Sequence, residues 1–208
     1  MVRDGIYYAV ALLGLGGFAV YWGGWLWGVP AWLATAFVLN FFRDPERAIP
    51  PGNGVVSPAD GKVVDVRQFA SPSGERWKIS IFLNVFDVHV NRAPVAGQIT
   101  EQVYRKGKFL VASVPEASTE NEQNAITILA PGAASGEHVV MKQIAGLVAR
   151  RIVPYKQVGD KVGRGERIGL IKFGSRVDVE MPATYSLLVK VGERVKAGAS
   201  LLANPPAK

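Results

Sequence analysis

The chain has 208 residues, 49% of them hydrophobic, which is enough for one sizeable core and a modest extra element but not for two large domains. It contains no cysteine, so disulfide frameworks, thiolate zinc sites and a cysteine nucleophile are excluded. There are 24 Lys and Arg residues against 17 Asp and Glu, and the net charge of +7 suits an anionic partner such as nucleic acid or lipid headgroups.

The first element is an apolar stretch that carries no charged residue from Gly5 to Phe42. It is longer than the about 20 residues that one spanning helix needs. The stretch therefore predicts two short helices broken near residues 23–24, or one span followed by an interfacial segment, within a membrane-associated region of residues 1–44. Aromatic residues that favour a membrane interface gather around the break: Tyr21, Trp22, Trp25, Trp27 and Trp32.

The apolar stretch is also compatible with a cleavable signal peptide or with a buried helical hairpin of a soluble protein. It is too long for the roughly 7–15 apolar residues of a signal peptide. Basic residues flank it at Arg3, Arg43 and Arg47, which favours the cytoplasmic side of the membrane for both ends. We therefore expect a protein of the cell membrane that works at the cytoplasmic face.

After a loop rich in proline and glycine, residues 45–208 consist of short strand-like runs separated by turn residues. The run at residues 158–166 returns in similar form at residues 191–199, and each copy is a glycine-bracketed turn followed by an apolar run. Hairpins of this kind resemble those of lipoyl and biotinyl carrier domains. The expected fold is therefore mainly β, a compact lipoyl-like barrel-sandwich body that follows an N-terminal hydrophobic helical segment.

Two stretches of the β region hold candidate acid–base residues. Asp60 lies in a Pro-Ala-Asp-Gly turn, which is either an ordinary turn or part of a site. The run of residues 79–94 is predicted as one strand, and its period of two places Asp87, His89 and Asn91 on the same face. A carboxylate two residues from an imidazole can orient the ring for proton transfer, or it can form a purely stabilising pair.

A third stretch, residues 144–154, carries the adjacent arginines Arg150 and Arg151. They are suited to bidentate phosphate contacts, or they form a solvated charge pair on an edge strand. We expect no metal site, because two histidines without cysteine make no recognisable ligand cluster. A fourth stretch holds Gly174 followed by Ser175, and a serine in a strained turn can attack the preceding carbonyl and split the backbone.

Taken in order, five stretches are similar to phosphatidylserine decarboxylases, in particular to the short bacterial and archaeal branch that includes archaetidylserine decarboxylases. The resemblance covers nearly the whole chain. It is carried by residues 41–47, 57–63, 84–97, 144–153 and 173–175.

The resemblance implies a proenzyme that cuts itself between Gly174 and Ser175 into a large chain, residues 1–174, and a small chain, residues 175–208. The Ser175 hydroxyl would form an ester with the Gly174 carbonyl, β-elimination would follow, and hydrolysis would leave Ser175 as a pyruvoyl cofactor, with no metal. That group would form a Schiff base with the amine of phosphatidylserine and accept the electrons released with CO2, so that the product is phosphatidylethanolamine.

The resemblance also implies roles for individual residues. Asp60 and Ser175 match two members of the family's self-cleavage triad, and His89 matches the histidine of decarboxylation. Arg92 stands where larger members carry a second histidine, so His89 is expected to serve both reactions. Asp87 is expected to orient the His89 ring, and Arg150 and Arg151 are expected to contact the phosphodiester of the lipid.

The implied partners are a phospholipid membrane and the two chains of the precursor; a homodimer is compatible with this interpretation, and nucleic acid is not expected. Two alternatives stay open. One is a membrane-anchored lipoyl-like carrier or adaptor without catalysis. The other is a pyruvoyl decarboxylase that acts on a different amino-acid headgroup.

Overall fold

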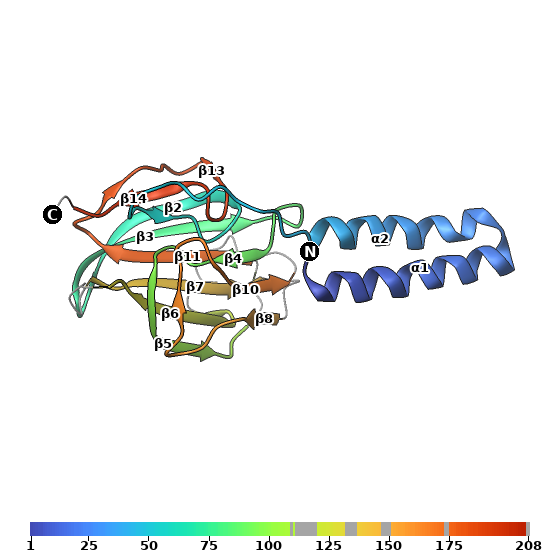
Figure 1. The fold of residues 1–208 in the computed structure, drawn as a ribbon, viewed down its shortest axis with the longest axis horizontal. Helices are drawn as coiled ribbons and strands as arrows, with labels where there is room; N and C mark the ends of the chain where they lie inside the picture. Colours follow the sequence, from blue (N-terminus) through green and yellow to red (C-terminus); the bar gives the residue numbers. More distant parts are fainter. Residues whose placement is uncertain (109, 111–119, 132–136, 147–150, 173–174, 207–208) are drawn as a thin grey trace. The chain divides into compact units, whose positions relative to one another are not determined.

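The computed structural model describes residues 1–108, 110, 120–131, 137–146, 151–172 and 175–206. The chain forms two compact units, residues 1–46 and residues 47–208. The first unit is helical and the second consists of β-strands (Figure 1).

The helical unit is a hairpin of α1 (Arg3–Gly23), the short 3₁₀ helix η1 (Trp25–Gly28) and α2 (Val29–Phe41). Gly24 ends α1 with a φ of 85°, a conformation that glycine adopts without strain. The two ends of the hairpin are joined by a hydrogen bond of 3.0 Å from the Val2 amide to the Phe42 carbonyl. The break predicted near residues 23–24 is therefore confirmed.

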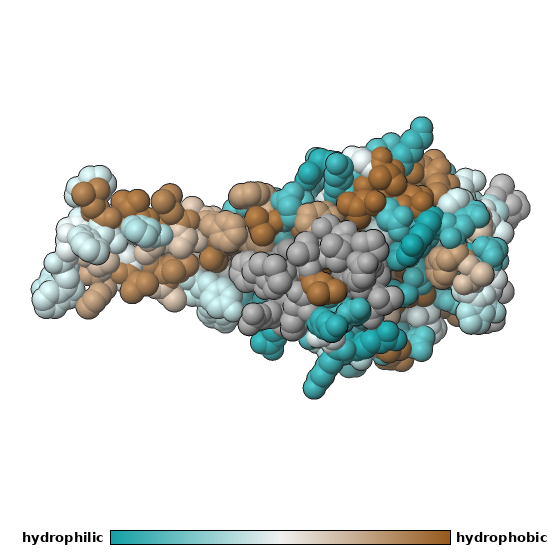
Figure 2. All heavy atoms as spheres, turned by 180° about the vertical axis from the view of Figure 1, so that it is seen from behind, coloured by the Kyte–Doolittle hydropathy of each residue, from teal (hydrophilic) through white to brown (hydrophobic). Residues whose placement is uncertain are grey.

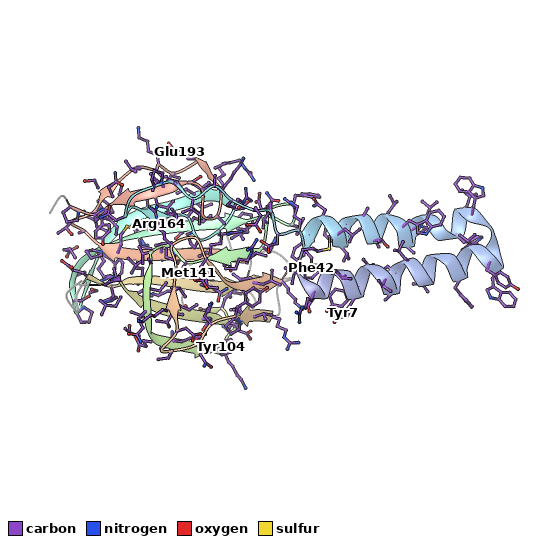
Figure 3. All side chains as sticks on the ribbon, in the orientation of Figure 1. Tyr7, Phe42, Tyr104, Met141, Arg164 and Glu193 are labelled. Atoms are coloured by element: carbon purple, nitrogen blue, oxygen red, sulfur yellow. The ribbon has the colours of Figure 1, made fainter. Side chains whose placement is uncertain are left out.

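Apolar and aromatic side chains cover the outside of this hairpin. Figure 3 shows side chains projecting outward along both helices, and Figure 2 shows brown and pale residues over the helical unit, whereas strongly hydrophilic residues lie on the β unit. Tyr21 is 81% exposed and Trp22 is 73% exposed. Among the described residues, α1 is the one helix long and apolar enough to cross a membrane. This unit can therefore anchor the chain to a membrane.

The β unit is built around a curled eight-stranded antiparallel sheet (Figure 1). Across the sheet the strands are β13 (Arg194–Val195), β2 (Gly61–Ser71), β3 (Gly74–Leu83), β11 (Ser175–Pro182), β7 (Val139–Ala145), β6 (Gln123–Leu129), β5 (Gly97–Arg105) and β9 (Lys161–Val162). Two three-stranded sheets complete the unit. The first holds β1 (Val55–Val56), β14 (Leu201–Asn204) and β12 (Ser186–Leu187), and the second holds β4 (Val90–Arg92), β10 (Arg167–Lys172) and β8 (Arg151–Pro154). The mainly β expectation is confirmed.

The core lies on one face of the eight-stranded sheet, because apolar and polar side chains alternate along its central strands. On β11 the core residues Val177 and Val179 alternate with the charged Arg176 and Asp178. Neighbouring strands add apolar side chains on the same face: Ile79, Ile81 and Leu83 of β3 and Met141 and Ala145 of β7. Strand β11 is therefore held on both sides in the middle of the sheet.

The near-repeat of the sequence corresponds to two equivalent strand–turn–strand units. In the first, β9 leads through a turn at Gly165, with φ of 75°, into β10; in the second, β13 leads through a turn at Gly198, with φ of 73°, into β14. In each unit the first strand joins an edge of the eight-stranded sheet and the second joins a three-stranded sheet. The repeat thereby ties the sheets of the β unit together.

The prediction of one strand over residues 79–94 is wrong. Strand β3 ends at Leu83, and β4 begins only at Val90 and belongs to a different sheet. Between them Asn84 closes a turn, with its Oδ1 accepting a hydrogen bond of 2.8 Å from the Phe86 amide. An asparagine side chain that bonds the main chain two residues on favours a turn over a strand.

Candidate active site

Ser175 is the first residue of β11 and is fully buried. It is paired with Leu83 on one side and with Ala145 on the other, both of them core residues. Its Oγ has no hydrogen-bond partner among the residues that the structure describes. A buried hydroxyl without a partner costs about 1–3 kcal/mol, which indicates that the group is kept for a purpose other than stability.

His89 lies between β3 and β4 and is also fully buried. Its Nδ1 is 2.9 Å from the main-chain carbonyl oxygen of Asp87. Because a carbonyl only accepts, Nδ1 carries the proton, and in the neutral ring Nε2 is the nitrogen that takes up a proton. The tautomer of the ring is therefore set by a main-chain contact within its own loop.

The carboxylate of Asp87 serves the turn that carries His89. Its Oδ2 accepts a hydrogen bond of 3.0 Å from the Asn84 amide, and its Oδ1 pairs with Arg194 of β13. The contact between Asp87 and the imidazole is thus made by the main-chain carbonyl. The role of Asp87 in orienting His89 stays a prediction, and its basis is this turn.

Asp60 lies in the loop before β2 and is largely buried. Its Oδ2 accepts a hydrogen bond of 2.7 Å from Arg47, and its Oδ1 accepts one of 2.8 Å from the Ala197 amide. Among the described residues no hydrogen bond joins Asp60 to Ser175 or His89. The carboxylate therefore fixes two neighbouring loops in this structure.

Arg92, at the end of β4, occupies the position where a second histidine was expected. Its side chain is buried and donates a hydrogen bond of 2.9 Å to the Gly165 carbonyl, and its amide donates to the Pro58 carbonyl. Arg92 is therefore part of the framework that connects β4 with the loop before Asp60. A permanently charged guanidinium is also unsuited to act as a base.

A buried ionic network begins directly after Ser175. The Arg176 guanidinium contacts Asp178 at 2.6 Å and the Ser80 hydroxyl at 2.8 Å, and Lys78 pairs with Asp178 at 3.3 Å. Because strand residues alternate, this network lies on the face opposite to the Ser175 side chain. It fixes β11 next to β3 and so holds the Ser175 main chain in register.

The other residues that the sequence predicts for the site are Gly174, Arg150 and Arg151. Gly174 and Arg150 lie outside the described residues. Arg151 begins β8 and is exposed. The described residues contain no group of three or more His, Cys, Asp or Glu that could hold a metal ion.

The structure adds residues that sequence reasoning missed. Arg47 and Arg194 pair with the two candidate aspartates. Asn124 and Gln143, both fully buried, form a hydrogen-bonded chain with Asn91. A sequence signal for the last pair exists, because both amides interrupt otherwise apolar positions of β6 and β7.

A buried serine at the start of a central strand and a buried histidine in the loop before β4 are side chains with which an enzyme could perform nucleophilic and acid–base chemistry. The profile of the phosphatidylserine decarboxylase family matches residues 34–203, most of the chain. The chain is 53% identical over 203 residues to a phosphatidylserine decarboxylase proenzyme of Solibacter usitatus, covering 98% of this chain and 96% of that one. It is 47% identical over 199 residues to the proenzyme of Nitrosomonas europaea, covering 94% and 88% of the two chains. The chain belongs to the phosphatidylserine decarboxylase family, a family of carboxy-lyases.

Proposed function

We propose that this protein is a proenzyme that cleaves its backbone between Gly174 and Ser175 and then decarboxylates phosphatidylserine to phosphatidylethanolamine. The observation that carries the proposal is the buried hydroxyl of Ser175 at the start of β11, which has no hydrogen-bond partner among the described residues. A free nucleophile in a fixed main chain has the reacting atom in place before the reaction begins. The relatives named as proenzymes support the same conclusion.

The surroundings of residue 175 fit a pyruvoyl group derived from its side chain. The position is buried between Leu83 and Ala145, and the loss of the serine Oγ would break no hydrogen bond to a residue that the structure describes. When formed, this group supplies a carbonyl that accepts electrons as the substrate carboxylate leaves as CO2.

We assign the proton transfers to His89. Its Nδ1 proton is held by the Asp87 carbonyl, so Nε2 is the atom that takes the proton of the Ser175 hydroxyl and later delivers a proton to the substrate carbon. Asp60, through Arg47 and the Ala197 amide, positions the loop beside β4 for self-cleavage. Arg150 and Arg151 are assigned to the phosphodiester of the lipid.

The helical hairpin anchors the enzyme to the cell membrane, with the β unit at the cytoplasmic face. A substrate with two acyl chains stays in the bilayer, so the enzyme has to meet its headgroup at the surface. Basic residues attract an anionic lipid surface, and the net charge of +7 agrees with this placement.

The test is to purify the full chain in detergent and determine its mass on a denaturing gel and by mass spectrometry. We expect two fragments, residues 1–174 and residues 175–208, the second with a blocked N-terminus, and release of labelled CO2 from phosphatidylserine vesicles but not from free serine. The Ser175→Ala variant is expected to stay whole and inactive. An uncut wild-type chain that releases no CO2 would refute the proposal.

A further inference from the structure

Four side-chain amides form a continuous hydrogen-bonded row on the core side of the β unit. Gln102 of β5 donates to Asn124 of β6 at 3.2 Å, and Asn124 donates to Gln143 of β7 at 3.0 Å. Gln143 in turn donates to Asn91 of β4 at 2.8 Å. The last three residues are fully buried.

All three hydrogen bonds of the row run the same way, with the donor on the side of β5 and the acceptor on the side of β4. In each inner amide the carbonyl oxygen accepts from one neighbour while the NH2 group donates to the next. Turning the Asn91 amide around would place its NH2 group against the NH2 group of Gln143. The row therefore fixes the Asn91 Oδ1 on Gln143 and leaves the Asn91 Nδ2 as its terminal donor, strengthened by the aligned amides behind it.

This terminal donor is buried, and within the described part of the chain it has no hydrogen-bond partner. An unpaired buried donor costs about 1–3 kcal/mol, so a structure that holds it rigidly calls for an acceptor that is present during the reaction. Ser175 Oγ is likewise a buried polar atom without a hydrogen-bond partner among the described residues.

The strand register brings the two atoms to the same region. On β7, Gln143 is opposite Val177 and Ala145 is opposite Ser175, so Gln143 and Ser175 share a face and are diagonal neighbours, about 7–8 Å apart. The Asn91 amide is bonded directly to Gln143, and His89 lies two residues before it. The Asn91 amide and the Ser175 side chain are thus both neighbours of Gln143 on the core side of β11.

We propose that Asn91 Nδ2 is a catalytic hydrogen-bond donor for self-cleavage, which stabilises the oxyanion formed when Ser175 Oγ adds to the peptide carbon before it. In this step the Oγ–C bond forms, the carbonyl electron pair moves onto oxygen, and the hydroxyl proton passes to His89. The oxyanion then collapses, the C–N bond breaks, and the Ser175 nitrogen takes the proton, which leaves an ester. The inference rests on the proposed function, because that function supplies the reaction.

The donor is tested by following self-cleavage of the full chain after pulse labelling in cell-free synthesis with detergent. Asn91→Asp keeps the size and the acceptor but removes the donor, and Gln143→Glu removes the bond that fixes the donor without touching the reacting atoms. Loss of one oxyanion donor slows a reaction by about 10²–10³-fold, and we expect a decrease of that order for Asn91→Asp. Gln98→Ala is the matched control; this exposed glutamine of β5 lies outside the row and donates to the Gly159 carbonyl, so the variant is expected to cleave at close to the wild-type rate.

A pH series separates this role from a structural one. A protonated carboxyl group has an O–H that can donate, so both carboxyl variants should regain cleavage relative to wild type as the pH falls. The cleavage rate of each variant is divided by the wild-type rate at the same pH, which corrects for protonation of His89. A role in packing alone would give a ratio that does not change with pH.

The outcomes are distinguishable. Variants that cleave at the wild-type rate, while wild type still cuts itself, would overturn the role of Asn91 and leave the proposed function standing. An uncut wild-type chain would refute the proposed function itself. Circular dichroism checks folding, and if Asn91→Asp does not fold, the rate and pH ratio of Gln143→Glu decide the question.

Discussion

At the scale of single residues, His89 is the side chain to which we assign the proton transfers. Its Nδ1 is bound to the Asp87 carbonyl, so in the proposed mechanism the proton is taken up and delivered at Nε2. We predict that His89→Ala lowers decarboxylation by at least about 10²-fold, the range that a positioned acid–base group contributes, and also slows self-cleavage. Both rates are measured on the same preparation, self-cleavage by gel and decarboxylation by CO2 release.

The other histidine provides the control. His138 uses its main-chain carbonyl to accept a hydrogen bond of 2.7 Å from Arg76, and this contact survives in His138→Ala. The control variant should therefore keep both rates. If His89→Ala cleaves fully and fails only in decarboxylation, the dual role is wrong and another group activates Ser175.

At the scale of elements, the turn between β3 and β4 decides where His89 lies. The Asp87 carboxylate closes this turn on the Asn84 amide and pairs with Arg194. Asparagine keeps an acceptor for the amide, whereas alanine does not. We predict that Asp87→Asn keeps self-cleavage and decarboxylation within about tenfold of wild type, while Asp87→Ala loses clearly more of both. Equal losses in the two variants would instead show that the negative charge acts on His89 directly.

The turn between β9 and β10 gives a prediction about pH. The pKa of Glu166 is lowered from its ordinary value because its carboxylate is bonded to Lys156 and to the Gly163 amide. A carboxylate with a lower pKa in the folded state adds stability above its unfolded pKa, and this stability is lost as the pH falls through the folded pKa. Glu166→Gln should therefore be slightly less stable than wild type at pH 7, the effect being small because the side chain is 39% exposed.

Urea unfolding at several pH values measures this difference. It should vanish below the ordinary glutamate pKa of about 4.3, once the folded carboxylate is protonated as well. A difference that stays constant down to acid pH would mean that the glutamine packs poorly and that the charge is not responsible.

The helical unit and part of the candidate site could be predicted from the sequence. The helical hairpin was predictable because an uncharged run interrupted by glycines leaves few alternatives, and Ser175 and His89 could be proposed from residue type and context. The single strand over residues 79–94 was wrong, because a period of two continues across the turn at Asn84. The ion pair of Asp87 with Arg194 joins residues that are 107 positions apart in the sequence. Such a contact depends on the order of the strands in the sheet, which a local sequence pattern does not reveal.

At the scale of the whole molecule, the length of the helical hairpin bears on how it would lie in a membrane. The 21 residues of α1 are about 32 Å long, close to the about 30 Å of the hydrocarbon core. The aromatic residues at the turn, such as Trp22 and Trp25, would then reach the far interface, where amphipathic rings are favoured. A hairpin that turns back inside the bilayer would instead leave the indole N–H groups of the turn without water.

Tryptophan quenching by lipids labelled at known depths separates these two arrangements. Of the five tryptophans, only Trp77 of β3 lies outside the hairpin. Its buried Nε1 has no hydrogen-bond partner among the described residues, so Trp77→Phe is expected to fold and to confine the signal to the helical unit. In vesicles containing phosphatidylserine we predict that labels near the headgroups quench this variant more strongly than labels near the bilayer centre. Stronger quenching from the centre would place the turn within the hydrocarbon and make the hairpin re-entrant, because quenching needs close approach of the label to the indole rings.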